Sequence, residues 1–80
     1  MKEENLTKCR QIIDELNCRR RQLEYCNDEN SVLEIALTKS GKGSVAIGRL
    51  SDTAVAAIKA MAATELARRI SALEKELEKL

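Results

Sequence analysis

Apolar residues follow a helical period in the first third of the chain, over residues 6–26. They recur at spacings of three, four, three and seven, and Ile12 widens the stripe that they form: Leu6, Cys9, Ile13, Leu16 and Leu23. Such spacing places the apolar side chains on one face of an amphipathic helix. The polar run at residues 27–31 then ends the predicted helix, because these side chains compete for backbone hydrogen bonds.

The middle of the chain, residues 32–50, contains two short runs with strand-like alternation. Ile35 and Leu37 alternate with more polar neighbours in the first run, and Val45 and Ile47 lie on one side of the second. Residues 39–43, which connect the runs, include glycines that tolerate positive φ. The pattern predicts a β-hairpin. A helix through residues 32–38 that ends at Gly41 is the alternative, because short apolar runs are ambiguous by period alone.

The sequence pattern over residues 51–80 predicts a second helix. Ser51 is a favourable N-cap, and Leu50 with Val55 fits the spacing of a hydrophobic staple. The first half of this segment is rich in alanine, and the second half has an apolar a/d pattern at spacings of four and three: Leu66, Ile70, Leu73, Leu77 and Leu80. We therefore expect one domain over residues 1–80. Its fold class is α+β, mostly α, with a β-hairpin (32–50) between two antiparallel helices (6–26 and 51–80).

The amino-acid composition leads us to expect that the chain also associates with itself. The chain has 80 residues and contains no phenylalanine, tryptophan, proline or histidine, and Tyr25 is its only aromatic residue. A core this small is marginal alone, and an isolated hairpin is unstable in water. We expect a homo-oligomer with closed symmetry. The net charge of +1 argues against a general polyanion binder, and we expect no sequence-specific nucleic acid among the partners.

The residues that usually carry catalysis are scarce. Without histidine, the common acid–base and triad arrangements are missing, and no carboxylate group resembles a metal site. Cys9, Cys18 and Cys26 are odd in number and are interpreted as reduced structural thiols, which favours the cytoplasm. No apolar run approaches a membrane span, and the first residues lack the apolar core of a signal peptide. We expect no enzyme activity, cofactor, metal or membrane partner.

Between Glu34 and Asp52 the chain carries no acidic residue, and this acid-free stretch holds all three glycines. Exposed backbone N–H groups beside lysines can bind an anion, as can the start of a helix. The stretch departs from a nucleotide-hydrolase loop, because glycine follows Lys42 and a strand follows the turn. An ordinary solvated turn is the alternative. The candidate ligand-binding residues are Lys39, Ser40, Gly41, Lys42, Gly43, Arg49, Ser51 and Thr53.

A second candidate surface lies on the first predicted helix. Arg19, Arg20 and Arg21 form a cationic cluster beside Tyr25, and arginine and tyrosine are common interface anchors. The alternative is a solvated helix face whose cations pair with neighbouring carboxylates. If the cluster is an interface, its partner is another protein.

A hairpin between two antiparallel helices resembles, in topology only, the β-type prefoldin subunit, whose helices are much longer. Leu50-Ser51-Asp52 and the segment 70–77 are also similar to small phage-encoded helix–hairpin–helix proteins. The second resemblance implies an inhibitor of host defence in the host cytoplasm. Two hypotheses follow. The first is a non-enzymatic oligomer that sequesters an anionic nucleotide-type ligand, and the second is an interaction or assembly module that contacts a host protein or serves as a structural or chaperone-like protein.

Overall fold

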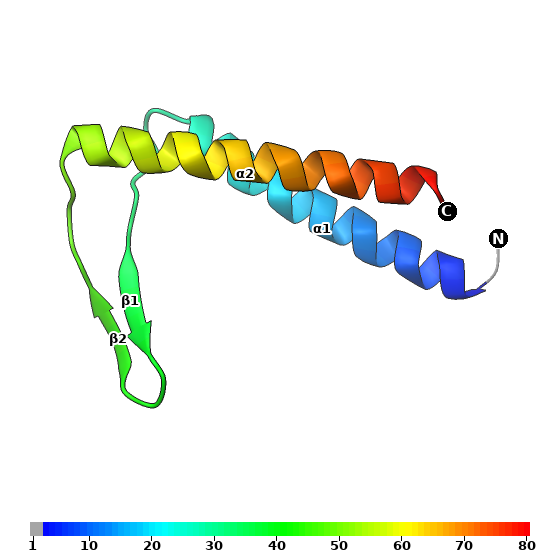
Figure 1. The fold of residues 1–80 in the computed structure, drawn as a ribbon, viewed down its shortest axis with the longest axis horizontal. Helices are drawn as coiled ribbons and strands as arrows, with labels where there is room; N and C mark the ends of the chain where they lie inside the picture. Colours follow the sequence, from blue (N-terminus) through cyan, green and yellow to red (C-terminus); the bar gives the residue numbers. More distant parts are fainter. Residues whose placement is uncertain (1–2) are drawn as a thin grey trace.

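The computed structural model describes residues 3–80, which form two long helices and a two-stranded antiparallel sheet (Figure 1). Helix α1 spans Glu3–Asn27, β1 Ala36–Lys39, β2 Gly43–Ala46 and α2 Asp52–Glu78. The predicted fold class is confirmed, because a β-hairpin lies between two helices that dominate the chain. The alternative helix through residues 32–38 is wrong, since this segment leads into and includes part of β1.

The ends of the helices follow the local sequence signals. Ser51 has an extended backbone, and its Oγ accepts a hydrogen bond from the Ala54 N–H at 3.2 Å, as expected of an N-cap. At the end of α1, the Ser31 hydroxyl lies 2.6 Å from the carbonyl oxygen of Tyr25. The Asn30 N–H donates to Asp28 Oδ1 at 2.9 Å. These polar side chains satisfy backbone groups that the helix leaves free and redirect the chain.

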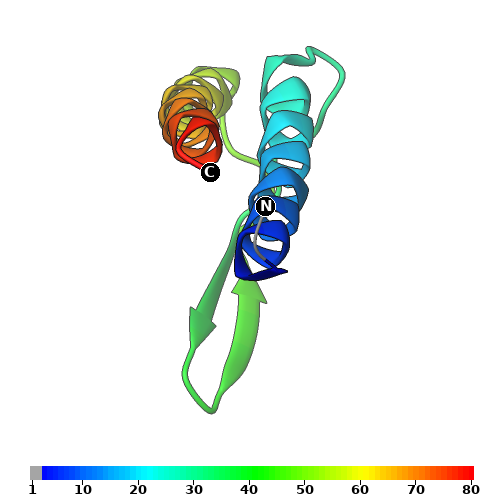
Figure 2. The same ribbon diagram turned by 90° about the vertical axis from the view of Figure 1, so that its right-hand side faces the viewer.

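The helices pack against each other along one face each, and their chain directions are opposite (Figures 1 and 2). The buried side chains are Ile12 and Leu16 from α1 and Leu66 and Ile70 from α2. Half-buried leucines extend this core along the pair: Leu23, Leu73, Leu77 and Leu80. Burial of a side chain of this size contributes about 1.5–3 kcal/mol, so the helical pair holds the main internal source of stability.

The buried face of α1 contains part of the expected stripe but not all of it. Leu6 and Ile13 belong to the predicted stripe but are 54% and 42% exposed. The packed face consists of Ile12, Leu16 and Leu23, which also belong to the expected stripe. The reason is that Ile12 and Ile13 are adjacent apolar residues, and only contact with α2 selects which of the two turns inward.

Residues 32–50 leave one end of the helical pair and project sideways as an arm (Figure 1). Within the arm, Ala36 lies opposite Ala46 and Leu37 opposite Val45. Over residues 3–80, neither strand contacts either helix. The ladder is shorter than the predicted hairpin, because residues 32–35 and 47–50 form two extended legs that join the strands to the helices.

Candidate functional site

The arm carries an exposed apolar face. Leu37 and Val45 are cross-strand partners, and the Ile47 N–H donates to the Ile35 carbonyl oxygen at 3.0 Å, so these four residues share one face of the hairpin. Leu37 is 65% and Val45 71% exposed. Single exposed apolar residues are ordinary, but a contiguous group on a projecting element indicates a contact surface. We call Ile35, Leu37, Val45 and Ile47 the apolar face of the arm.

The other face of the ladder carries small or hydroxyl side chains. Ala36 and Ala46 are opposite one another, and the Thr38 and Ser44 hydroxyl oxygens lie 3.0 Å apart in a hydrogen bond. Every residue of both strands is exposed. The ladder is therefore open on both faces, and its register is stabilised by its own backbone bonds and this hydroxyl pair.

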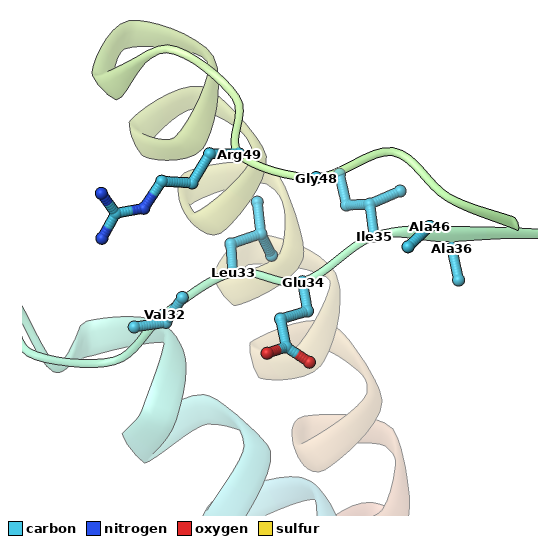
Figure 3. A pocket seen from close by; sticks show the side chains of 8 residues that line it. All are labelled: Val32, Leu33, Glu34, Ile35, Ala36, Ala46, Gly48 and Arg49. Atoms are coloured by element: carbon cyan, nitrogen blue, oxygen red, sulfur yellow. The ribbon is translucent and has the colours of Figure 1, made fainter.

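A cleft of about 610 Å³ lies between the two legs at the base of the arm. Its lining is mainly apolar, and Glu34 and Arg49 are its two charged residues. Leu33 and Ile35 point to one side of their leg and Glu34 to the other, and the Arg49 guanidinium points away from the Glu34 carboxylate (Figure 3). The cleft is therefore lined mainly by apolar side chains, and its two opposite charges, on Glu34 and Arg49, do not form an ion pair with each other.

The tip of the arm, residues 39–43, is a tight turn closed by a hydrogen bond from the Lys42 N–H to the Lys39 carbonyl oxygen at 3.0 Å. Gly41 has φ +74°, a conformation that residues with a Cβ rarely adopt. Lys39 and Lys42 are exposed on either side of this turn. The tip therefore presents two solvent-exposed cations. This arrangement is also what an ordinary solvated turn would have.

The predicted ligand-binding residues fall into two separate groups. Lys39, Ser40, Gly41, Lys42 and Gly43 form the tip, whereas Arg49, Ser51 and Thr53 lie at the base of the arm and the start of α2. The ladder stands between these groups, so one chain does not gather them around a single small ligand. The Ser51 hydroxyl is also engaged, because it accepts the N–H of Ala54 as a helix cap.

The arginine cluster on α1 is spread around the helix rather than gathered. Arg19 lies in the seam between the helices, with 27% of its side chain exposed, and pairs with Glu15 at 3.5 Å. Arg20 is more exposed and pairs with Glu74 of α2 at 3.7 Å. Two of the three cations are therefore paired with carboxylates of the same chain.

Arg21 and Tyr25 form the remaining part of the predicted partner surface. The Arg21 guanidinium carbon lies 5.8 Å from the centre of the Tyr25 ring, a cation–π distance. A side-chain hydrogen bond with Tyr25, followed by the charge interaction with its phenol group, raises the pKa of Arg21 above the usual value. Arginine is already protonated at neutral pH, so this shift leaves its charge unchanged.

Lys59 is a positioning residue that the sequence did not reveal. Its Nζ donates to the Ser31 carbonyl oxygen at 2.7 Å and the Ser31 Oγ at 2.8 Å, and a longer contact of 3.3 Å reaches the Asp28 carbonyl oxygen. An ammonium group has three donors, and these acceptors can use all of them. The half-buried lysine thus ties α2 to the loop from which the arm departs.

The three cysteines are free thiols; Cys9 and Cys26 are half-buried and Cys18 is exposed. In the part of the chain that the structure describes, no cluster of three or more histidine, cysteine or acidic side chains is arranged to hold a metal ion. Across residues 3–80, no helix has both the length and the apolar character needed to cross a membrane.

Comparison of the chain with known protein families, with curated proteins and with solved structures finds no match. The resemblances to prefoldin subunits and to small phage proteins therefore rest on the layout and residues of this chain.

Proposed function

We propose that this chain is a non-enzymatic interaction and assembly protein that associates with copies of itself through the arm. The observation that carries the proposal is the exposed apolar face of a hairpin whose two strands contact neither helix within residues 3–80. The helical pair is the scaffold that carries this arm. The helices pack their core residues against each other and leave Leu6, Ile13, Tyr25 and Met61 exposed, whereas the arm gathers its apolar residues on one face of a projecting hairpin.

The energetics of a two-stranded sheet support this proposal. An isolated hairpin is at best marginally stable in water, and three or more strands or packing against another element are needed for stability. This hairpin obtains no packing from α1 or α2. Burial of its apolar face in an assembly supplies the missing stabilisation at about 25 cal/mol for each Å² of apolar surface removed from water.

The test compares oligomeric state in matched variants by sedimentation at micromolar concentration. We expect the wild type to form a defined dimer or larger assembly, and the double variant Leu37→Ser, Val45→Ser to sediment as a monomer. Met61→Ser is the control, because Met61 is as exposed as Val45, at 73%, but lies on α2. It should leave the assembly intact. A wild-type chain that remains an 8.9 kDa monomer contradicts the proposal.

Anion binding by the assembled tips is a second candidate function. It is favoured by the acid-free stretch, in which Lys39 and Lys42 lie on an exposed turn and have no acidic residue among their immediate sequence neighbours. In an assembly, the tip of one copy and Arg49 of another can approach, although they are separate within one chain. This candidate corresponds to a phage protein that sequesters a nucleotide signal, and it retains the self-association of the first proposal.

Calorimetric titration with pyrophosphate and with linear and cyclic dinucleotides tests this candidate. We expect Lys42→Glu and Arg49→Glu each to weaken binding by an amount on the order of 1 kcal/mol or more, because attraction becomes repulsion. Binding should also weaken as salt is added. Arg20→Glu on α1 is the control and should bind normally. Loss of binding in that variant alone, with both arm variants unaffected, removes this candidate.

A further inference from the structure

The two edges of the hairpin differ in how their charges are distributed. The chain that leads into β1 is acidic, with Asp28, Glu29 and Glu34, and β1 ends at the cations of the tip. The β2 side has Lys42 at its start and Arg49 after its end, with no acidic residue between them. The β1 edge is therefore acidic at one end and basic at the other, whereas the β2 edge is basic at both ends.

The backbone of the β1 edge is available for pairing. Because the Ile47 N–H bonds to the Ile35 carbonyl, antiparallel alternation makes Leu37 and Val45 the next hydrogen-bonded pair. The N–H and C=O groups of Ala36 and Thr38 consequently point outward from β1. Ala36 is exposed, as are the other ladder residues. An edge of this kind is a template for another strand.

The middle of this edge, over residues 36–38, has no charged residue, proline, bulge or covering helix that would prevent such pairing. The register from Ala36 to Lys39 is continuous, so no bulge interrupts it, and the lysines are confined to the tip. Over the described residues, no helix covers the strand. Proteins that protect a free edge place charges, prolines, bulges or covering elements along it.

The charged residues of the arm also form no ion pair among residues 3–80. The ion pairs found over residues 3–80 all lie on α1 and α2, and they do not involve Glu34, Lys39 or Lys42. Glu34 and Lys39 are separated by about 17 Å of extended strand, so they cannot pair with each other in one chain. Opposite charges thus lie at the two ends of one edge.

We propose that β1 pairs antiparallel with β1 of a second copy around a two-fold axis. The pairing brings Glu34 of each copy to the tip of the other. Glu34 and Lys39 leave the backbone on opposite faces of the sheet, but the long lysine side chains of the tip can reach the carboxylate around the end of the strand.

The pairing converts two marginal hairpins into one four-stranded sheet and sets the apolar side chains of the two β1 strands beside each other across the new ladder, which buries part of each apolar face. The same arrangement through β2 would place Lys42 against Arg49. This inference rests on the proposed self-association and specifies the edge that performs it. It is an alternative to anion binding at the tips, because Glu34 of the other copy then offsets the charge of their lysines.

Two proline variants distinguish the edges by sedimentation. Ala36→Pro removes an outward N–H from β1 and leaves the bonds within the hairpin in place. Its cross-strand partner gives the matched control, since Ala46→Pro removes an outward N–H from β2. We expect Ala36→Pro to raise the dimer dissociation constant at least about a hundredfold and Ala46→Pro to leave it nearly unchanged. The reverse result overturns the assignment to β1.

Charge variants decide the outcome if both prolines disrupt the hairpin. Glu34→Lys and Lys42→Glu should each weaken the dimer about tenfold, because two symmetric ion pairs become repulsive at once. Their combination restores the opposite charges and should recover most of the lost affinity. Failure of the combination to recover affinity overturns the antiparallel pairing. Stronger association of Lys42→Gln also overturns it, because that result indicates tips that repel each other side by side.

Zero-length carbodiimide coupling of the wild-type chain gives an independent measurement. In a mixture of ¹⁴N- and ¹⁵N-labelled protein, we expect mixed-isotope cross-links from Glu34 to Lys39 or Lys42. A wild-type monomer in sedimentation refutes the proposed function as a whole. An assembly that forms without these cross-links and is unaffected by the edge variants refutes only the pairing through β1.

Discussion

The helical pair and the arm both have regular apolar patterns in sequence, but the apolar side chains are buried in the helical pair and exposed in the arm. In the helical pair, Leu16 is 3% and Ile70 8% exposed, because each helix covers the apolar face of the other. In the arm, Leu37 and Val45 are well over half exposed although they are paired across the ladder. A regular apolar pattern is thus covered by contacts within the chain in the helical pair, and it stays exposed to solvent in the arm.

This difference indicates where the chain depends on another molecule. Native domains are stable by only about 0.05–0.15 kcal/mol per residue, so a region without internal packing contributes little by itself. Binding of a partner to the folded arm adds stability in proportion to the logarithm of partner concentration. The helical pair should therefore determine the stability of the isolated chain, and the arm should make stability depend on concentration.

The largest expected effect is the loss of a core side chain from the helical pair. Leu16→Ala should lower the free energy of unfolding by about 2–5 kcal/mol, because it leaves a cavity where α1 meets α2. Leu6→Ala is the control on the same helix, and its effect should be within about 0.5 kcal/mol because Leu6 is 54% exposed. Denaturant titration at one fixed protein concentration measures both values. Equal losses in the two variants would contradict the assignment of the core.

Local signals made the elements predictable. The Ser51 cap, the polar end of α1 and the glycine turn each act within a few residues, and the structure contains all three. The side of α1 that packs against α2 was less predictable, since Ile12 and Ile13 are both apolar and only the contact with α2 determines which of them is buried. The division of the predicted ligand site is similar. Lys42 and Arg49 belong to one acid-free stretch in sequence, but the ladder between them separates the tip from the base.

The least predictable contact is the bond from Lys59 to Ser31, which joins residues 28 positions apart. The sequence around Lys59 shows only a lysine within an alanine-rich helical segment, and a lysine there is usually a solvated charge. Its role depends on where the loop after α1 places its carbonyl oxygens, and this follows from the packing of the two helices. Contacts of this kind connect the two regions and are not visible in either pattern alone.

A smaller effect is expected when this connection is removed. Lys59→Met keeps the aliphatic stem but loses the ammonium group, so three hydrogen-bond contacts to the loop disappear. We expect a loss of about 1–2 kcal/mol rather than the sum of three charged bonds, because water can reach the freed oxygens of this partly exposed site. For a domain of this size, each 1 kcal/mol corresponds to about 4–8 °C in Tm.

The control for this variant is Lys75→Met, which removes an exposed charge from the same helix and should change Tm little. Hydrogen exchange locates the effect: protection should fall in residues 28–33, at the base of the arm, and persist around Leu16 and Ile70. A uniform fall along both helices would mean that Lys59 belongs to the helical core. A local fall, with the core unchanged, places Lys59 at the joint that holds the arm in position while the helical pair remains folded on its own contacts.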